Sequence, residues 1–297
     1  MKTINNIKKE LDLDIRKVSF YDNIKYIETN KGNYIVKKSI DNRIYRILDK
    51  NNYDNYIENI KTINNHDIYP YIDDLEIDSN ERALDLIYLM SKLHKSTSYY
   101  KNINILEIKD YYEKTYEKIK DLNNYYDYLR FMTEEKDFYT TTDIYFLKNI
   151  SIIYISLDLA SKYLEEWYHI MKDIKSIRIS LIHNNLDLSH IIENNKPFLI
   201  SWDRYKYDKP IYDFIVFYKK EFKDLDFLDL FNIYKNNLKL TKEEILLMYI
   251  ELLIPKKIIF NENDLKNIYE LTCQNIYLNK TCYFVSEDNK INQWNKY

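Results

Sequence analysis

Leu-Ile-His-Asn-Asn-Leu-Asp-Leu-Ser-His (residues 181–190) and Pro-Phe-Leu-Ile-Ser-Trp-Asp (residues 197–203) are the runs that say most about this chain. Short apolar stretches lie at 178–182 and 197–202, and the polar turn Asn194–Lys196 falls between them. Apolar runs of this length, bounded by turn residues, favour strands over helices. The segment therefore predicts a short β-hairpin of unusual polar residues, set within a region whose other patterns are helical.

At the N-terminal side, residues 18–38 alternate in a strand-like way. Asn30–Asn33 interrupts the alternation as a hairpin turn, and Gly32 supplies the positive φ that such a turn needs. Gly32 is also the only glycine of the chain. Because a glycine-rich loop lets backbone N–H groups close around phosphates, a nucleotide must be held differently here, or is not held at all.

Helical patterns account for most of the remainder. Asp78 and Glu81 are spaced as a capping box for a helix that continues to about Ser96. Residues 42–64 predict short helical pieces, and 68–72 predict a strand around Pro70. Longer helices are expected at 108–129, 143–175, 211–223, 225–237, 241–254 and 262–279, with a loop at 133–142 and a second capping box at Thr241–Glu244.

The order of these motifs resembles the kinase-like family of aminoglycoside phosphotransferases, choline kinases and spore-coat kinase-like proteins. That family typically shows His-Gly-Asp-x-x-x-x-Asn, a short hairpin, Ile-Asp-Trp-Glu and then Asp-Pro-x-x-Asp. This chain has His-Asn-Asn-Leu-Asp-Leu-Ser-His at 183–190, the hairpin, Ile-Ser-Trp-Asp at 200–203 and Asp-Lys-Pro-Ile-Tyr-Asp at 208–213.

The resemblance implies a protein-kinase-like two-lobed α+β fold. Residues 1–78 would form a small N-lobe with an antiparallel β-sheet. Residues 79–297 would form an interlobe helix and a mostly α-helical C-lobe, with the catalytic-loop-like hairpin at 181–203.

The departures from the family pattern fall on the positions that carry its chemistry. In kinase-type phosphoryl transfer, one Asp positions the attacking hydroxyl group, while an Asn and a second Asp hold Mg²⁺. In this register Asn185 replaces the catalytic Asp, His190 replaces the metal-binding Asn, and Ser201 replaces the second metal-binding Asp. An amide cannot accept a proton at neutral pH, and serine brings no charge to Mg²⁺, which prefers carboxylate oxygen. The resemblance therefore implies degraded catalytic motifs.

Other family positions are retained. His183, Trp202, Asp208 and Asp213 match residues with a structural role, bracing the catalytic loop. Lys37 matches the strand lysine that pairs with the nucleotide phosphates, and Glu58 is the candidate for its acidic helix partner. The plainer alternative for Lys37 is an exposed strand lysine beside Lys38. His190 has no His or Cys partner at a metal-ligand spacing, so a packed histidine is its alternative reading.

A shifted register leaves activity open. Asp187 and Asp203 each lie two residues beyond a lost carboxylate, and their separation in sequence equals that of Asn185 and Ser201. Two residues of extended chain span about 6–7 Å, which is large beside the distances that catalysis requires. These two aspartates define the alternative hypothesis, an active ATP- and Mg²⁺-dependent small-molecule phosphotransferase.

The main functional hypothesis is a catalytically impaired pseudokinase that acts as a ligand- or protein-binding module. It needs no cofactor, unless nucleotide binding is retained, in which case ATP and Mg²⁺ are expected. A structural component of the spore-coat type is a further alternative that the resemblance implies.

Composition limits the partners. The chain has 297 residues with 44 basic and 47 acidic side chains, and its net charge of −3 gives no reason to expect nucleic acid. We find no signal peptide and no apolar run near the ~20 residues of a spanning helix, and we expect Cys273 and Cys282 to be reduced. These features predict a cytoplasmic protein. The 32 tyrosines and the abundant Asn, Lys and Ile are typical of an AT-rich genome.

Overall fold

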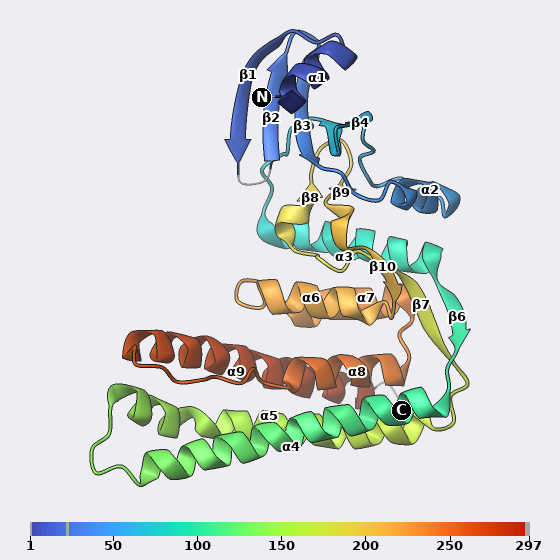
Figure 1. The fold of residues 1–297 in the computed structure, drawn as a ribbon. Helices are drawn as coiled ribbons and strands as arrows, with labels where there is room; N and C mark the ends of the chain where they lie inside the picture. The colour runs from blue at the N-terminus through green and yellow to red at the C-terminus, as the bar shows by residue number, and fades with distance from the viewer. Residues whose placement is uncertain (1, 22–23, 295–297) are drawn as a thin grey trace. The chain divides into compact units, whose positions relative to one another are not determined.

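The computed structural model describes residues 2–21 and 24–294, which form two compact units (Figure 1). The first unit comprises residues 1–98 and 180–207, and the second comprises 99–179 and 208–297. The hairpin at 181–203 and the helix that follows Asp78 thus fold together with the N-terminal strands. The lobe boundary at residue 78, which the resemblance implies, stays a prediction.

The first unit is built on an antiparallel sheet with the strand order β1-β2-β3-β5-β4. Its strands are β1 (Ile15–Tyr21), β2 (Ile24–Thr29), β3 (Gly32–Lys38), β4 (Lys61–Ile63) and β5 (His66–Pro70). The predicted hairpin is confirmed, since Thr29 pairs with Gly32 and Gly32 has a φ of 125°. A positive φ costs a glycine little because it has no Cβ.

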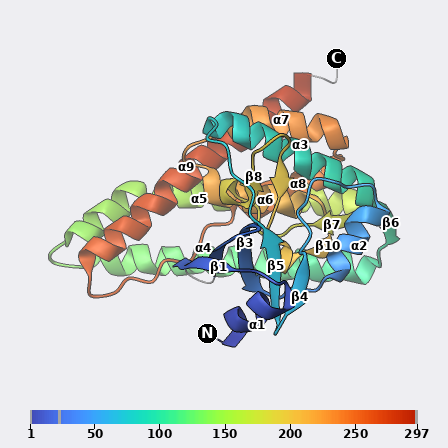
Figure 2. The same ribbon diagram turned by 90° about the horizontal axis from the view of Figure 1, so that it is seen from above.

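One face of this sheet is covered by α1 (Lys2–Glu10), which lies beside the strands in Figure 2. Ile27, Val36 and Ile68 are fully buried in one cluster with Ile7 of α1. Because alternate residues of a strand point to opposite faces, the side chains of Lys37 and of its β5 partner Asp67 lie on the other face.

The segment between β3 and β5 differs in part from the prediction. The helix α2 (Arg43–Lys50) forms, but residues 51–60 are irregular and are followed by β4 rather than by further helix. Asn51 caps the end of α2, and Asn52 adopts a left-handed conformation with a φ of 55°, which no α-helix can continue. Asparagine tolerates this conformation better than most residues, so the asparagine-rich sequence ends the helix early.

The remaining elements of the first unit are α3 (Ser79–Thr97), the short hairpin of β8 (Ile191–Ile192) and β9 (Phe198–Leu199), and two 3₁₀ turns, η1 (Leu188–His190) and η2 (Trp202–Arg204). Asp78 caps α3 as predicted, and its side chain accepts a hydrogen bond from the backbone N of Asn80 at 2.8 Å. Within the described part of the chain, the reciprocal contact from Glu81 is not formed.

The second unit is mostly helical. It contains α4 (Ile105–Glu134), α5 (Thr141–Met171), α6 (Ile211–Glu221), α7 (Phe227–Leu238), α8 (Lys242–Leu253) and α9 (Asp264–Trp294). All the predicted helices are confirmed, and α9 runs well beyond the predicted residue 279. The predicted capping box of α8 is also confirmed, with Thr241 N donating to Glu244 at 2.9 Å.

The strand β6 (Tyr99–Asn102) was not predicted. It pairs antiparallel with β7 (Ser176–Ile182), and Tyr99 lies opposite Ile179. Its four side chains are all exposed, so β6 has no apolar alternation from which it could be predicted. A further short strand, β10 (Lys206–Asp208), precedes α6.

The helices α4 and α5 form a long antiparallel hairpin, and α5 also packs against α8 and α9 (Figure 1). Among the described helices, α5 alone is long and apolar enough to cross a membrane by composition. Its buried side chains, which include Phe146, Leu157, Leu164 and Trp167, pack inside the helical unit. A single helix of this kind is weak evidence for a membrane span, because a core helix can have the same length and composition.

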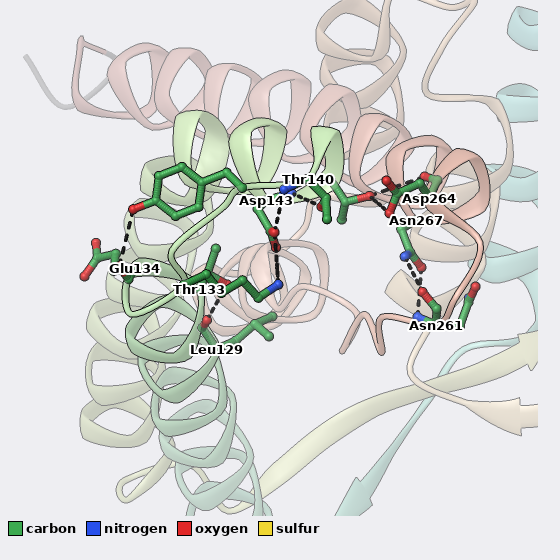
Figure 3. Close-up of polar contacts among 11 residues, drawn as sticks. Leu129, Thr133, Glu134, Thr140, Asp143, Asn261, Asp264 and Asn267 are labelled. Carbon is green, nitrogen blue, oxygen red and sulfur yellow. Dashed lines mark hydrogen bonds and ion pairs between the residues drawn. The ribbon is translucent and has the colours of Figure 1, made fainter.

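A polar network fixes the tip of the α4–α5 hairpin (Figure 3). The buried carboxylate of Asp143 accepts hydrogen bonds from Lys136 at 2.8 and 2.9 Å and from the backbone N of Thr140 at 2.9 Å. Burial alone would raise the pKa of Asp143, but these donors outweigh it and hold the pKa below its usual value. Thr142 donates to Asp264 at 2.9 Å, which joins this tip to the start of α9.

We predict that Asp143→Asn lowers the free energy of unfolding by about 1–2 kcal/mol. It removes a capping box, worth about 1 kcal/mol, and an ion pair whose lysine remains half-exposed to water. Urea denaturation at pH 7 measures the change. The control is Asp137→Asn, which removes an exposed carboxylate from the same turn, and equal losses in the two variants would contradict the assignment.

Candidate functional site

The β8–β9 hairpin is held from two sides within the first unit. On one side, Leu199 N donates to the carbonyl O of Asn55 at 2.9 Å, and the Asn55 amide donates to the carbonyl O of Pro197 at 2.9 Å. On the other side, Leu75 N donates to the carbonyl O of Glu193 at 2.8 Å, and Arg82 forms an ion pair with Asp74 while donating to the carbonyl O of Ile191. The hairpin therefore has a fixed position against its flanking segments.

The segments before and after the hairpin are joined to each other directly. His183 Nε2 donates to the carbonyl O of Ile200 at 2.8 Å, and the Asn184 amide donates to the carbonyl O of Arg204 at 3.2 Å. The backbone N of Ile200 donates to the carbonyl O of His190 at 3.0 Å. These contacts bring the candidate residues of 183–190 and 200–204 into one site.

Lys37 reaches this site from the sheet. Its Nζ donates to Ser201 Oγ at 3.3 Å, across 164 positions of sequence. Burial lowers the pKa of Lys37, and the nearby carboxylate of Asp203 opposes that lowering without cancelling it. The ammonium group is therefore drawn out of water without a full counter-charge.

Asp203 is the carboxylate whose charge acts on Lys37. Its side chain is half-exposed, and its closest cation is Arg204, with Nε 3.8 Å from Oδ2. Its charge also acts on Tyr69 of β5, whose pKa is raised to about 12, mainly by burial. Lys37, Ser201, Asp203 and Tyr69 thus form a polar cluster, which we call the lysine cluster.

Two residues of the lysine cluster's surroundings were missed by the sequence analysis. Tyr69 and Tyr45 share a hydrogen bond of 2.8 Å between their hydroxyl groups, and both are largely buried. The available signal was strand register, because Tyr69 pairs with Ile35, two residues before Lys37. In a chain with 32 tyrosines, residue type alone cannot distinguish them.

Ser201 has a left-handed backbone, with φ 66° and ψ 54°. For a residue other than glycine this conformation costs roughly 1–2 kcal/mol. Asn184, in the facing segment, has a φ of 60°. Such strain is concentrated at functional sites. The cost is met here by the contacts that join the two segments.

The predicted brace residues fall into two groups. His183 and Trp202 are fully buried and in contact, with ring centroids 4.9 Å apart. The ring of Tyr53 also packs against Trp202, with centroids 6.1 Å apart. Asp208 and Asp213 lie in the second unit. Asp208 accepts a hydrogen bond from the backbone N of Lys209 at 2.8 Å, and Asp213 is buried in the first turn of α6.

Asp187 and His190 belong to the η1 turn. The Asp187 carboxylate caps the turn by accepting from Ser189 N at 2.9 Å, and it lies 3.1 Å from His190 Nδ1. Asn185 is half-buried two residues earlier. Glu58 is exposed, and in the described part of the chain it forms no ion pair with Lys37. The site residues proposed from the sequence stay predictions, with these positions as their context.

The donor set at the lysine cluster fits an anion better than a resident metal ion. No group of three or more His, Cys, Asp or Glu side chains that could hold a metal occurs in residues 2–21 and 24–294. Mg²⁺ is commonly held by one or two carboxylates together with substrate phosphates. Here Asp203 is accompanied by a neutral hydroxyl group, and Asp187 is engaged in the η1 turn.

Comparison with solved structures identifies the fold. No family description and no curated protein sequence matches the chain. An aminoglycoside phosphotransferase from Alicyclobacillus acidocaldarius superimposes with a TM-score of 0.63 at 12% identity, over 93% of this chain and 92% of that one. A spectinomycin phosphotransferase solved with ADP and spectinomycin gives 0.55 at 12% identity, over 95% and 97%.

The chain has the kinase-like fold of these phosphotransferases. The α+β architecture that the resemblance implied is therefore confirmed, with its antiparallel sheet and mostly helical remainder. At such low identity the comparison establishes the fold alone.

The hairpin also contains a titrating carboxylate. Glu193 is buried beside Asp85, Asp74, Glu81 and Arg82, and its Oε1 accepts no hydrogen bond within the described residues. Burial, together with the charge of Asp85, raises its pKa to about 7.

We predict a pH dependence from this group. A folded-state pKa above the unfolded value of about 4.5 means that the native state binds more protons, so stability is full at acid pH and is lost as pH rises towards 7. Glu193→Gln should therefore raise the melting temperature at pH 8 relative to the parent and leave it nearly unchanged at pH 5. Glu76→Gln, at an exposed position of the same unit, serves as the control. A Glu193→Gln effect of the same size at both pH values would rule out this origin.

Proposed function

We propose that this chain is a kinase-like protein with impaired phosphoryl transfer, which binds a nucleotide through Lys37 as a ligand-binding module. The observation that carries the proposal is the contact between Lys37 and Ser201. In the family that the chain resembles, a metal-binding carboxylate occupies the position of Ser201. In this chain Ser201 presents a neutral hydroxyl group to Lys37. The site keeps the phosphate-binding cation and lacks the carboxylate for the metal.

The charge balance supports an anionic ligand. The lowered pKa of Lys37 means that desolvation outweighs the attraction of Asp203. A phosphate beside the ammonium group would supply the missing negative charge in a partly desolvated place, where charge-assisted hydrogen bonds are strong. The spectinomycin phosphotransferase of the same fold has been solved with AMP as well as with ADP. Nucleotide binding is therefore the ligand class proposed for this chain.

We predict that ATP raises the melting temperature without Mg²⁺ and that Lys37→Ala removes this shift. At a hundredfold excess over the dissociation constant, a ligand specific for the native state stabilises by about 2.7 kcal/mol. Lys38→Ala is the matched control, because it removes the same charge from the neighbouring, exposed position on the opposite face of β3. An ATP-dependent shift that persists in Lys37→Ala would overturn the proposal.

An active phosphotransferase is the second candidate, and the position of Asp203 favours it. Asp203 is the carboxylate whose charge reaches Lys37, and it remains half-exposed and open to a cation. Asp187 offers less support, since its carboxylate is engaged by the η1 turn and His190. In this alternative Asp203 alone would hold Mg²⁺ with the help of the substrate phosphates.

The variant Asp203→Asn separates the two candidates. In the impaired protein, Asp203 only repels the phosphates, so its neutralisation should tighten Mg²⁺-free ATP binding by up to about fivefold, the scale expected for partly exposed charges. Mg²⁺-dependent ATP turnover should be at background in both the parent and the variant. Calorimetric titration and a phosphate-release assay measure these quantities. Turnover in the parent that the variant loses would establish the active enzyme instead.

A further inference from the structure

The second unit contains a pocket of about 880 Å³ between α4, α6 and the C-terminal end of α8. Its walls include Leu122, Ile254 and Pro255, and the other lining residues are aspartates, glutamates and lysines. A pocket of this volume is in the range that accepts small molecules. All of its residues belong to the second unit, so it is separate from the lysine cluster of the first unit.

The acidic residues of this pocket are mostly engaged by neighbours. Asp110 pairs with Lys114 at 2.8 Å, Glu113 with Lys109 at 3.5 Å, and Glu117 with Lys120 at 3.7 Å, all along α4. Glu251 of α8 accepts a hydrogen bond from the hydroxyl group of Tyr111 at 3.0 Å. Asp121 also lines the pocket and has no such contact among the described residues.

The lysines are not engaged in this way. Lys118, Lys219 and Lys256 come from three separate segments, and none of their ammonium groups forms an ion pair or hydrogen bond within the described residues. Lys257 lies over the ring of Tyr125 at 4.1 Å, a contact that leaves its charge uncompensated. Three of the five acids are therefore paired along α4, and the unpaired lysines outnumber the two remaining acids, so the charge left over in the pocket is positive.

The three lysines lie close enough to repel one another. Although part of the Lys219 side chain is exposed, desolvation by the pocket walls lowers its pKa. Glu251 opposes this lowering, while the ammonium groups of Lys118 and Lys256 add to it. Without a ligand, three like charges share one recess at an energetic cost that a bound anion would remove.

We infer that this pocket is a binding site for a small multiply charged anion, with phosphate groups as the best chemical match. Lysine ammonium groups bind phosphate as point charges and need no fixed planar geometry. Three of them, placed on separate helices and turns, can contact different oxygens of one ligand. The apolar side chains of Leu122 and Pro255 leave room for an organic part of that ligand.

The test is calorimetric titration with inorganic pyrophosphate. It is carried out in the Lys37→Ala background, so that binding at the first unit does not contribute. The double variant Lys118→Gln/Lys219→Gln should weaken binding by at least about tenfold, because it removes two charge-assisted hydrogen bonds to the anion. The matched control is Lys148→Gln/Lys162→Gln, which removes two charges from exposed positions of α5 outside the pocket.

Unchanged binding in the control, together with the loss in the pocket variant, supports the site. Three outcomes overturn it: no binding at millimolar pyrophosphate, equal weakening in both double variants, or full binding in the pocket variant. Circular dichroism and melting temperatures verify that each variant is folded. Should the pocket double variant not fold, the single variant Lys256→Gln is compared with Lys148→Gln by the same criteria.

Discussion

Asn55 holds the hairpin on which the whole candidate site depends. It is buried, its backbone O accepts from Leu199, its amide donates to the carbonyl O of Pro197, and Lys92 donates to its side-chain oxygen at 2.7 Å. The neighbouring ion pairs of Asp54 with Lys92 and Lys196 are exposed, and such pairs are worth about 0–1 kcal/mol. An unsatisfied buried polar group costs about 1–3 kcal/mol, so the hydrogen bonds of Asn55 dominate. They hold the β9 side of the hairpin that connects 183–190 to 200–204.

The chemistry of the site follows from what that meeting places beside Lys37. A half-buried ammonium group requires a counter-charge, and the nearest groups supply one neutral hydroxyl and one half-exposed carboxylate. Had a carboxylate occupied position 201, its charge would stand at hydrogen-bond distance from the lysine. With serine there, the group that meets the lysine at that distance is neutral. The same reasoning applies to the lysines around the α4–α6–α8 pocket, where three of the five acids form local pairs along α4. Both units thus contain positive charge that the chain does not neutralise.

Much of the fold could be predicted because local chemistry and tertiary structure agree. Gly32 marks the β2–β3 turn, Thr241 and Glu244 mark the start of α8, and the apolar spacing of α4 and α5 survives in the packed helices. The exposed strand β6 and the irregular segment 51–60 could not be predicted, since their conformation comes from pairing partners and from a left-handed Asn52 rather than from periodicity. The contact of Lys37 with Ser201 has no local signal at all, and only the resemblance to a family suggested that the two lie together. The capping role of Asp187 was likewise hidden, because an aspartate in a turn and one in a catalytic loop look the same in sequence.

The scarcity of glycine affects the backbone of the site. With one glycine available, the left-handed positions of the described chain fall on other residues, namely Asp12, Asn52, Asn64, Asn65, Asn184, Ser201 and Lys239. Asparagine and aspartate can offset part of the steric cost by local hydrogen bonds, and they supply most of this set. Serine offsets less of this steric cost than asparagine or aspartate does. Ser201 nevertheless adopts the left-handed conformation at the point where its hydroxyl group contacts Lys37. The left-handed backbone at Ser201 therefore coincides with the position at which its hydroxyl group meets Lys37.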